Sequence, residues 1–295
     1  MIKVITPATS ANLGPGFDTL GIALALCNTF EVEKTRKFEV TGGPKKFQNE
    51  DNLFIVAFKE VCKKANKNIK CSVKIQTKIP VSRGLGSSAS LIVGGAVAAN
   101  ELLDNPFNKE EIYNICANLE GHPDNVAPCI YGGLHLAYKD DNGRYMDYIL
   151  HLADNVYFTT IIPNYELSTV EARNVLPQSY PREDAVYNLQ RAMLTIKSLE
   201  YGDHFTLRKA CEDRLATPYR KGLIKEFDQV LKTVRYNSGT CLMISGSGST
   251  MLAISDRSNF GESIRGFLPE NLKVMDLGVD YFGTRVIHNE KKKIK

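Results

Sequence analysis

The chain has 295 residues, enough for one large or two small domains, and its hydrophobic content of 43% is enough for a buried core. The net charge of +4 is mild, and the one dense lysine run, residues 291–295, is typical of a solvated terminus rather than a nucleic-acid-binding surface. No apolar run approaches the roughly 18 residues that span a bilayer, and no signal peptide opens the chain. Seven scattered cysteines without a Cys-x-x-Cys pair favour neither a disulfide framework nor a zinc site, so we expect a cytoplasmic protein.

The first half of the chain mixes strands with helices. Strands are predicted over residues 2–8 and 19–33, separated by a loop of small and turn-forming residues. Apolar residues at helical spacing predict a helix from Leu53, which Asp51 or Asn52 can cap. A strand over 71–77 leads through a Gly/Ser loop into a helix over 87–103. Asn108 opens another helix, with Glu111 in the place that a capping box requires, and residues 140–143 form a hairpin turn.

The second half begins with a strand over 156–162, which Pro163 closes, so a domain boundary near this point is expected. Ser168 and Glu171 predict a second capping box and a short helix. A long helix over 183–200 and further helix to about 235 precede strands over 240–244 and 250–255, a helix near 259–267 and a final pair of strands. The irregular mixture of strands and helices predicts the α+β class.

The segment from residue 80 to residue 90 is the one around which the site is predicted. The first amides of a helix have no acceptor within the helix, and the helix dipole adds positive charge there, so a Gly/Ser loop that opens a helix is suited to binding an anion. Gly84 and Gly86 allow close approach of a ligand to the backbone. A serine cap on a buried helix is the alternative interpretation. The predicted phosphate-binding residues are Pro80, Val81, Ser82, Arg83, Gly84, Leu85, Gly86, Ser87, Ser88, Ala89 and Ser90.

Two further unusual stretches lie far from this loop in the sequence. One is Pro7-Ala8-Thr9-Ser10-Ala11-Asn12-Leu13-Gly14-Pro15-Gly16-Phe17-Asp18, and the other is Ser245-Gly246-Ser247-Gly248-Ser249. The loop lacks the lysine of a Walker A motif and the third glycine of a Rossmann fingerprint. Together, the three stretches resemble those of the GHMP small-molecule kinases across about the whole chain. The first stretch resembles the version found in the homoserine kinases of that superfamily.

The resemblance implies a two-domain GHMP kinase fold with the active site in the interdomain cleft, its domains spanning residues 1–155 and 156–295. It implies ATP- and Mg²⁺-dependent phosphorylation of L-homoserine to O-phospho-L-homoserine in threonine biosynthesis, by a homodimer without nucleic-acid or membrane partners. Another GHMP kinase, for a sugar, mevalonate-like or shikimate-like acceptor, is the nearest alternative. A non-catalytic relative that binds a nucleotide or metabolite is a third, which predicts an eroded phosphate loop.

The resemblance also assigns catalytic and metal-binding roles. Ser88 and Glu120 are expected to bind Mg²⁺, which typically takes one or two protein oxygens and keeps several waters; the alternative for Glu120 is a solvated carboxylate at a helix end. Asp124 is expected to orient or deprotonate the acceptor hydroxyl and Asn125 to hydrogen-bond to it, although both residue types also cap helices. Asn52 corresponds to a position that borders the nucleotide base.

The acceptor assignment follows from the chemistry of homoserine, which carries an ammonium, a carboxylate and a primary hydroxyl. Asp18 can pair with the ammonium, and Asn12 can bond to either charged end. A guanidinium suits a carboxylate bidentately, which favours Arg173 and Arg220. His122 can add a donor to the carboxylate. Either arginine considered alone would more readily be interpreted as a surface residue, and it is the combination with the N-terminal stretch that favours a substrate-binding role.

Overall fold

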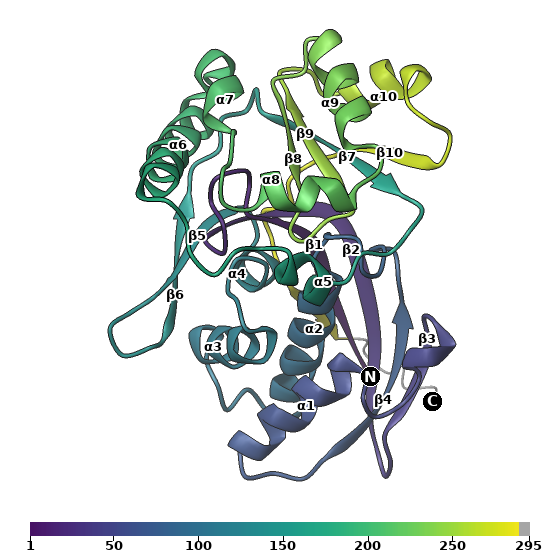
Figure 1. The fold of residues 1–295 in the computed structure, drawn as a ribbon. Coiled ribbons are helices and arrows are strands. Elements are labelled where there is room, and N and C mark those ends of the chain that lie inside the picture. Colours follow the sequence, from purple (N-terminus) through teal and green to yellow (C-terminus); the bar gives the residue numbers. More distant parts are fainter. Residues whose placement is uncertain (289–295) are drawn as a thin grey trace.

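We describe residues 1–288 of a computed structural model; the lysine run at 291–295 lies outside them. The chain builds two β-sheets with helices packed against each (Figure 1). The predicted α+β class is confirmed. Within residues 1–288, no helix combines the length and the apolar character needed to cross a membrane.

The first sheet has seven strands in the order β11-β1-β2-β4-β3, with β5 paired to β2 and β6 paired to β5. Every pairing is antiparallel except that of β3 with β4. The last strand returns to the beginning of the chain, where it pairs with β1 through Ile2↔His288 to Ile5↔Arg285. The strands are β1 (Ile2–Ala11), β2 (Leu20–Thr35), β3 (Glu39–Gly42), β4 (Lys70–Gln76), β5 (Leu134–Lys139), β6 (Tyr145–Leu150) and β11 (Arg285–His288).

Four helices pack together with this sheet around one core. Large buried side chains such as Phe30, Phe54, Phe58 and Tyr113 fill the space between them. The capping box predicted at Asn108 is present, because its side chain accepts from the Glu111 amide and the Glu111 carboxylate accepts from the Asn108 amide. The helices are α1 (Leu53–Lys64), α2 (Ser87–Leu102), α3 (Lys109–Glu120) and α4 (Val126–Tyr131).

The second sheet has four strands in the order β10-β7-β9-β8, all antiparallel. Alternate residues of its strands enter two different cores, so both faces of the sheet are covered. One core contains residues of α9 and α10, and the other contains residues of α6 and α7 together with β1 and β2 of the first sheet. The strands are β7 (Tyr157–Pro163), β8 (Cys241–Ile244), β9 (Met251–Ser255) and β10 (Leu272–Leu277).

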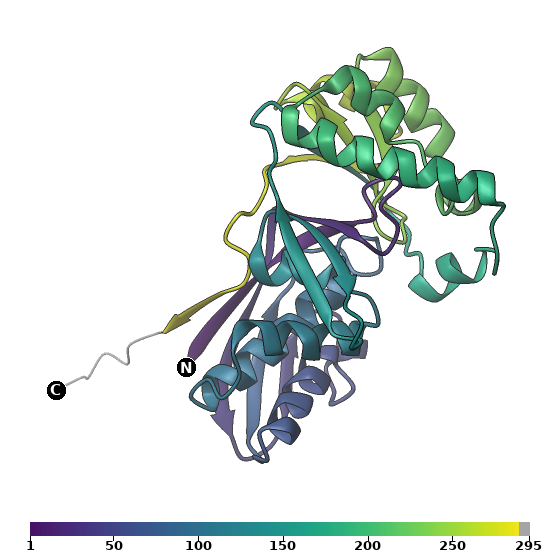
Figure 2. The ribbon, with the colours of Figure 1, turned by 90° about the vertical axis from the view of Figure 1, so that its left-hand side faces the viewer.

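The remaining helices lie in the second half of the chain, with α6 and α7 stacked beside the second sheet (Figure 2). They are α5 (Thr169–Asn174), α6 (Arg182–Tyr201), α7 (His204–Ala210), α8 (Thr217–Arg220), α9 (Phe227–Tyr236) and α10 (Phe260–Ile264). Single 3₁₀ turns occupy Lys45–Phe47, Lys221–Leu223 and Arg265–Phe267. The division of the chain into domains at residue 155 stays a prediction.

Candidate active site

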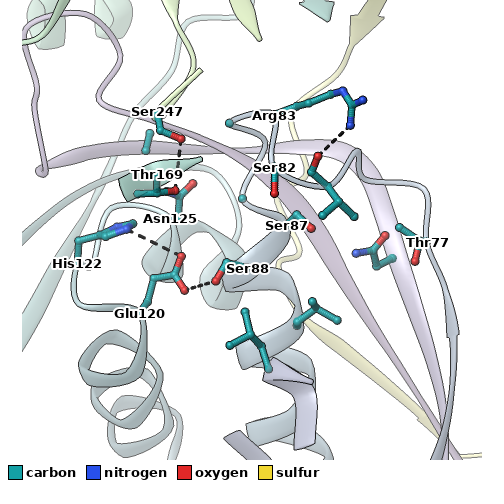
Figure 3. Close-up of a pocket in the computed structure, with 18 of the residues that line it drawn as sticks. Thr77, Ser82, Arg83, Ser87, Ser88, Glu120, His122, Asn125, Thr169 and Ser247 are labelled. Carbon is teal, nitrogen blue, oxygen red and sulfur yellow. Dashed lines mark hydrogen bonds and ion pairs between the residues drawn. The ribbon is translucent and has the colours of Figure 1, made fainter. Parts of the chain in front are cut away.

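A cavity of about 390 Å³ lies between the two halves of the chain (Figure 3). Residues of the first half line it from the β1–β2 loop, the segment before α2 and the segment between α3 and α4, and the second half contributes from α5, α8 and the β8–β9 turn. The predicted site residues that line it are Asn12, Asp18, Asn52, Val81, Ser82, Arg83, Gly84, Gly86, Ser87, Ser88, Glu120, His122, Asp124, Asn125, Arg173 and Arg220.

The phosphate loop ends in a left-handed Gly86 that caps α2, so the first turn of α2 presents its amides beside the cavity. Gly84 has a φ of +73°, and a Cβ on it would lie 2.1 Å from the carbonyl oxygen of Ser245. The Ser245 hydroxyl donates to the carbonyl of Gly84 over 2.6 Å. The β8–β9 turn therefore packs against the loop and supports it.

Five predicted phosphate-loop residues make other contacts or lie away from the cavity. Pro80, Leu85, Ala89 and Ser90 do not line it, and the last three are fully buried. Arg83 lines the cavity, but its guanidinium donates to three carbonyls, those of Val81, Pro163 and Asn164. Arg83 thus connects the loop to the end of β7 in the second sheet.

Ser88 and Glu120 meet although they are far apart in the sequence. The Ser88 hydroxyl donates to Oε2 of Glu120 over 2.6 Å (Figure 3). Burial raises the pKa of the Glu120 carboxyl, against the lowering effect of the Ser88 hydrogen bond and of His122. A hydroxyl and a carboxylate are the hard oxygen donors that Mg²⁺ prefers, and two protein ligands suffice for that ion, so the pair fits it. Within residues 1–288 there is no cluster of three or more His, Cys, Asp or Glu side chains suited to a metal.

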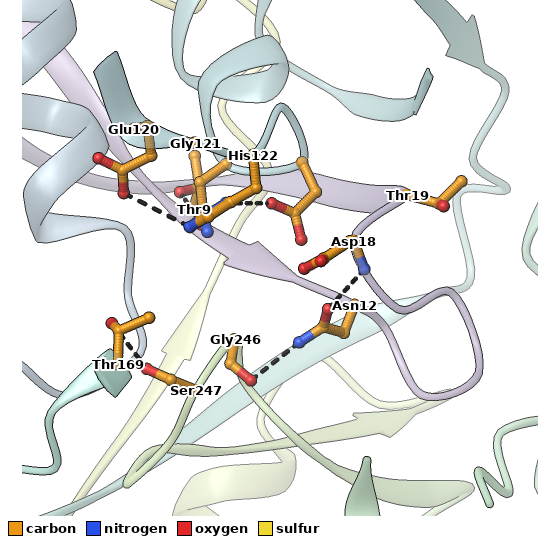
Figure 4. Close-up of polar contacts among 12 residues, drawn as sticks. Thr9, Asn12, Asp18, Thr19, Glu120, Gly121, His122, Thr169, Gly246 and Ser247 are labelled. Carbon is orange, nitrogen blue, oxygen red and sulfur yellow. Dashed lines mark hydrogen bonds and ion pairs between the residues drawn. The ribbon is translucent and has the colours of Figure 1, made fainter. Parts of the chain in front are cut away.

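His122 lies between two carboxylates (Figure 4). Its Nδ1 is 2.7 Å from Oδ1 of Asp124, and its Nε2 is 3.9 Å from Oε1 of Glu120. Burial lowers the pKa of the imidazole, but the hydrogen bond and charge of Asp124, with the charge of Glu120, outweigh burial and raise it overall. Asp124 itself is buried, and its neighbour Asn125 accepts from the Thr9 hydroxyl over 2.6 Å.

The predicted acceptor residues also line the cavity, where Asp18 and Arg173 form an ion pair with each other. Both carboxylate oxygens of Asp18 accept from Arg173, over 2.9 and 3.1 Å. Asn12 accepts from the Asp18 amide and donates to the carbonyl of Gly246 (Figure 4). Arg220 is only 3% exposed and donates to the carbonyls of Ala172 and Gly246.

The side chain of Asn52 is already used within the protein. It caps α1 by accepting from the Phe54 amide over 2.9 Å, and it donates to the carbonyl of Phe47 over 2.7 Å. Other residues that line the cavity were not predicted, because no local sequence motif marks them. They include Pro44, Phe47, Leu53, Thr77 and Leu91, with Thr169 and Ser247 across the cavity.

Known proteins resemble the chain in sequence and in structure. The family model for the GHMP kinases N terminal domain matches residues 52–133. The homoserine kinase of Clostridium beijerinckii is 42% identical to the chain, over 99% of this chain and 100% of the relative. The homoserine kinase of Clostridium botulinum strain Langeland is 40% identical over 99% and 100%, respectively.

Solved structures agree with these relatives. The crystal structure of homoserine kinase from Cytophaga hutchinsonii superposes with a TM-score of 0.88 at 29% identity and covers 97% of both chains. A mevalonate kinase with a TM-score of 0.70 and 14% identity shares the fold. The family resemblance predicted from the three motifs is confirmed: the chain belongs to the homoserine kinases of the GHMP kinase superfamily.

Proposed function

We propose that the protein transfers the γ-phosphoryl group of ATP to the side-chain hydroxyl of L-homoserine, giving ADP and O-phospho-L-homoserine for threonine biosynthesis. One observation carries the proposal. A single cavity is lined both by the start of a helix, which suits an anion, and by side chains of both charges, Asp18 with Arg173 and Arg220. A polyphosphate fits the helix start, and a zwitterionic amino acid fits the charged side chains.

The nucleotide site holds the phosphates through the backbone. In this proposal the amides at the start of α2 and the hydroxyls of Ser87 and Ser88 bind the phosphate oxygens. Ser88 and Glu120 would hold Mg²⁺, which when bound neutralises charge on the β- and γ-phosphate oxygens. Arg83 supports the loop and does not bind phosphate directly, because its guanidinium donors already bind backbone carbonyls. The apolar lining around Phe47, Leu53 and Leu91 leaves room for the base.

The transfer itself needs the acceptor hydroxyl in line with the γ-phosphorus. A bond forms between the homoserine oxygen and that phosphorus, and the bond to the bridging oxygen of ADP breaks. Asp124 accepts the hydroxyl proton on Oδ2, because His122 occupies Oδ1. Asn125 accepts from Thr9 through its oxygen, so its amide nitrogen is the group that donates to the hydroxyl oxygen. We place His122 as the residue that orients Asp124 rather than as a ligand of the carboxylate.

Homoserine would bind between Asp18 and Arg173 and replace their ion pair with two ion pairs to the substrate. The ammonium of homoserine binds Asp18, and its carboxylate binds Arg173 and Arg220. Asp18 and Arg173 therefore each exchange one charged partner for another of the same sign, and Arg220 gains one. Asn12 holds the turn that carries Asp18. A sugar has neither charge and would leave the separated pair uncompensated, which favours the amino acid. A homodimer, a cytoplasmic location and the absence of nucleic-acid or membrane partners stay predictions.

The test measures ADP release with Mg²⁺-ATP against L-homoserine, D-homoserine, L-serine, mevalonate, galactose and shikimate. We expect strong turnover with L-homoserine alone. Turnover with another acceptor would support kinase activity but overturn the assignment of L-homoserine as the substrate. No turnover with any of them, with ATP still bound in a titration, would indicate a non-catalytic relative.

A further inference from the structure

The guanidinium groups of Arg173 and Arg220 both lie over the ring of Phe17. The guanidinium carbon of Arg220 is 5.2 Å from the centre of the Phe17 ring, and that of Arg173 is 5.8 Å away. Both distances are within the range of cation–π attraction. Phe17 does not line the cavity itself, so its ring acts on the arginines and not on a bound ligand.

The two arginines need such a support because they repel each other. Burial, followed by the charge of Arg173, lowers the pKa of Arg220. Arg173 has the carboxylate of Asp18 as its partner, whereas Arg220 forms no ion pair with any residue in the range 1–288. Two carbonyls accept its hydrogen bonds and the face of the Phe17 ring lies beneath it, while the charges of Asp18, Asp213 and Asp124 act on it from beyond ion-pair distance.

The β1–β2 loop fixes the ring in this place. The amides of Thr19 and Leu20 donate to the carbonyl of Gly16, and the Thr19 hydroxyl donates to the carbonyl of Phe17 over 3.1 Å. Asp18 then adopts a φ of +52°, in the left-handed region that few residues other than glycine occupy. The turn presents the ring and the next carboxylate to the same guanidinium, that of Arg173.

We propose that Phe17 is a positioning residue that holds the guanidinium groups of Arg173 and Arg220 together as one receptor for the carboxylate of the acceptor. The proposal rests on the proposed function, in which these arginines bind that carboxylate. The ring has a negative face but no net charge, so the two arginines keep their positive charge and can still attract a substrate carboxylate. A carboxylate in the place of Phe17 would neutralise the receptor instead.

The experiment compares F17L with F17Y. Leucine keeps an apolar side chain and removes the aromatic face, whereas tyrosine keeps both the face and the position. We expect F17L to raise the KM for L-homoserine about tenfold, in keeping with the loss of two cation–π contacts, while the KM for ATP stays within about twofold. F17Y should remain within about twofold of the unsubstituted protein for both substrates. Equal KM values in F17L and the unsubstituted protein, or equal losses in F17L and F17Y, would overturn the proposal.

A second readout needs no activity. The Nε–H of Arg220 donates to a buried carbonyl and should give a resolved resonance in a ¹H–¹⁵N spectrum, assigned by its loss in R220K. The resonance should move when the Phe17 ring is removed in F17L and stay near its place in F17Y; an unmoved resonance in F17L would contradict the stacking. R173M separates the two proposals. If R173M leaves the KM for homoserine unchanged, the acceptor assignment fails; if R173M raises it and F17L does not, the role of Phe17 alone fails.

Discussion

Replacing Gly84 by alanine tests whether the phosphate loop depends on its contact with the β8–β9 turn. The new Cβ would lie 2.1 Å from the carbonyl oxygen of Ser245 and 2.8 and 2.9 Å from the carbonyl oxygen and amide nitrogen of Gly248. All three atoms belong to the backbone, so no side-chain rotation relieves the clash. The left-handed φ of +73° costs alanine about 1–2 kcal/mol. Overpacking adds about 1–3 kcal/mol, for a total of about 2–5 kcal/mol.

Two assays measure this effect. Thermal unfolding should show a Tm lower by roughly 5–10 °C, and steady-state kinetics should show a higher KM for ATP and a kcat reduced by up to about a hundredfold, because the loop must move by about 1 Å. G143A is the matched control: Gly143 has a φ of +77°, but a Cβ on it would meet no atom within 4 Å. G143A should lose only the roughly 1–2 kcal/mol of stability that the left-handed backbone costs alanine, and its kinetic constants should not change. Equal losses of Tm in the two variants, with an unchanged KM for ATP in G84A, would refute the reasoning.

Three further predictions concern the polar chain from Ser88 to Asp124. D124A should lower kcat by about 10²–10⁴-fold and leave the Kd of ATP nearly unchanged, as stopped-flow nucleotide binding would show; equal losses in both would place Asp124 away from the acceptor. E120Q should raise the Mg²⁺ concentration for half-maximal activity about tenfold or more. Burial raises the pKa of Glu120 above its ordinary value of 4.5. The apparent Mg²⁺ affinity of the unsubstituted protein should therefore increase as the pH rises and Glu120 loses its proton. The same pH dependence in E120Q would show that Glu120 is not its cause. The raised pKa of His122 means that charged His122 contributes stability that is fully present below about pH 6.5 and is lost as the pH rises through its folded-state pKa. Urea unfolding of the unsubstituted protein and H122N should therefore differ most at low pH, and a difference independent of pH would contradict the assignment.

The sequence predicted the parts of this site that local backbone chemistry determines. Glycines and serines after a strand predicted the loop that opens α2, and Asn108 with Glu111 predicted the start of α3, because both signals act over a few residues. Most strand and helix limits agree within a few residues with the structure. Strand β3 was not predicted, because Glu39–Gly42 is short, mostly exposed and without an apolar alternation.

The side-chain partners could not be predicted, because they depend on tertiary contacts. Arg83 stands in the phosphate loop but reaches the end of β7, and Asp18 meets Arg173 across the two halves of the chain. A motif specifies which residues stand near a ligand, but not whether their donors and acceptors are already used. Asn52 is a second example. Its position before α1 correctly predicted that it caps the helix, but its side-chain oxygen then accepts from the Phe54 amide and is already used before any contact with a base.

The pairing of β11 with β1 has a consequence for the order of synthesis. The strand that covers the outer side of β1 is synthesised after every strand of the second sheet. Until then β1 remains an open edge, with backbone groups available to a neighbouring chain. The first sheet of this enzyme therefore cannot be completed before the second sheet has been synthesised, and nascent chains of this kinase should need protection of that edge until β11 has emerged.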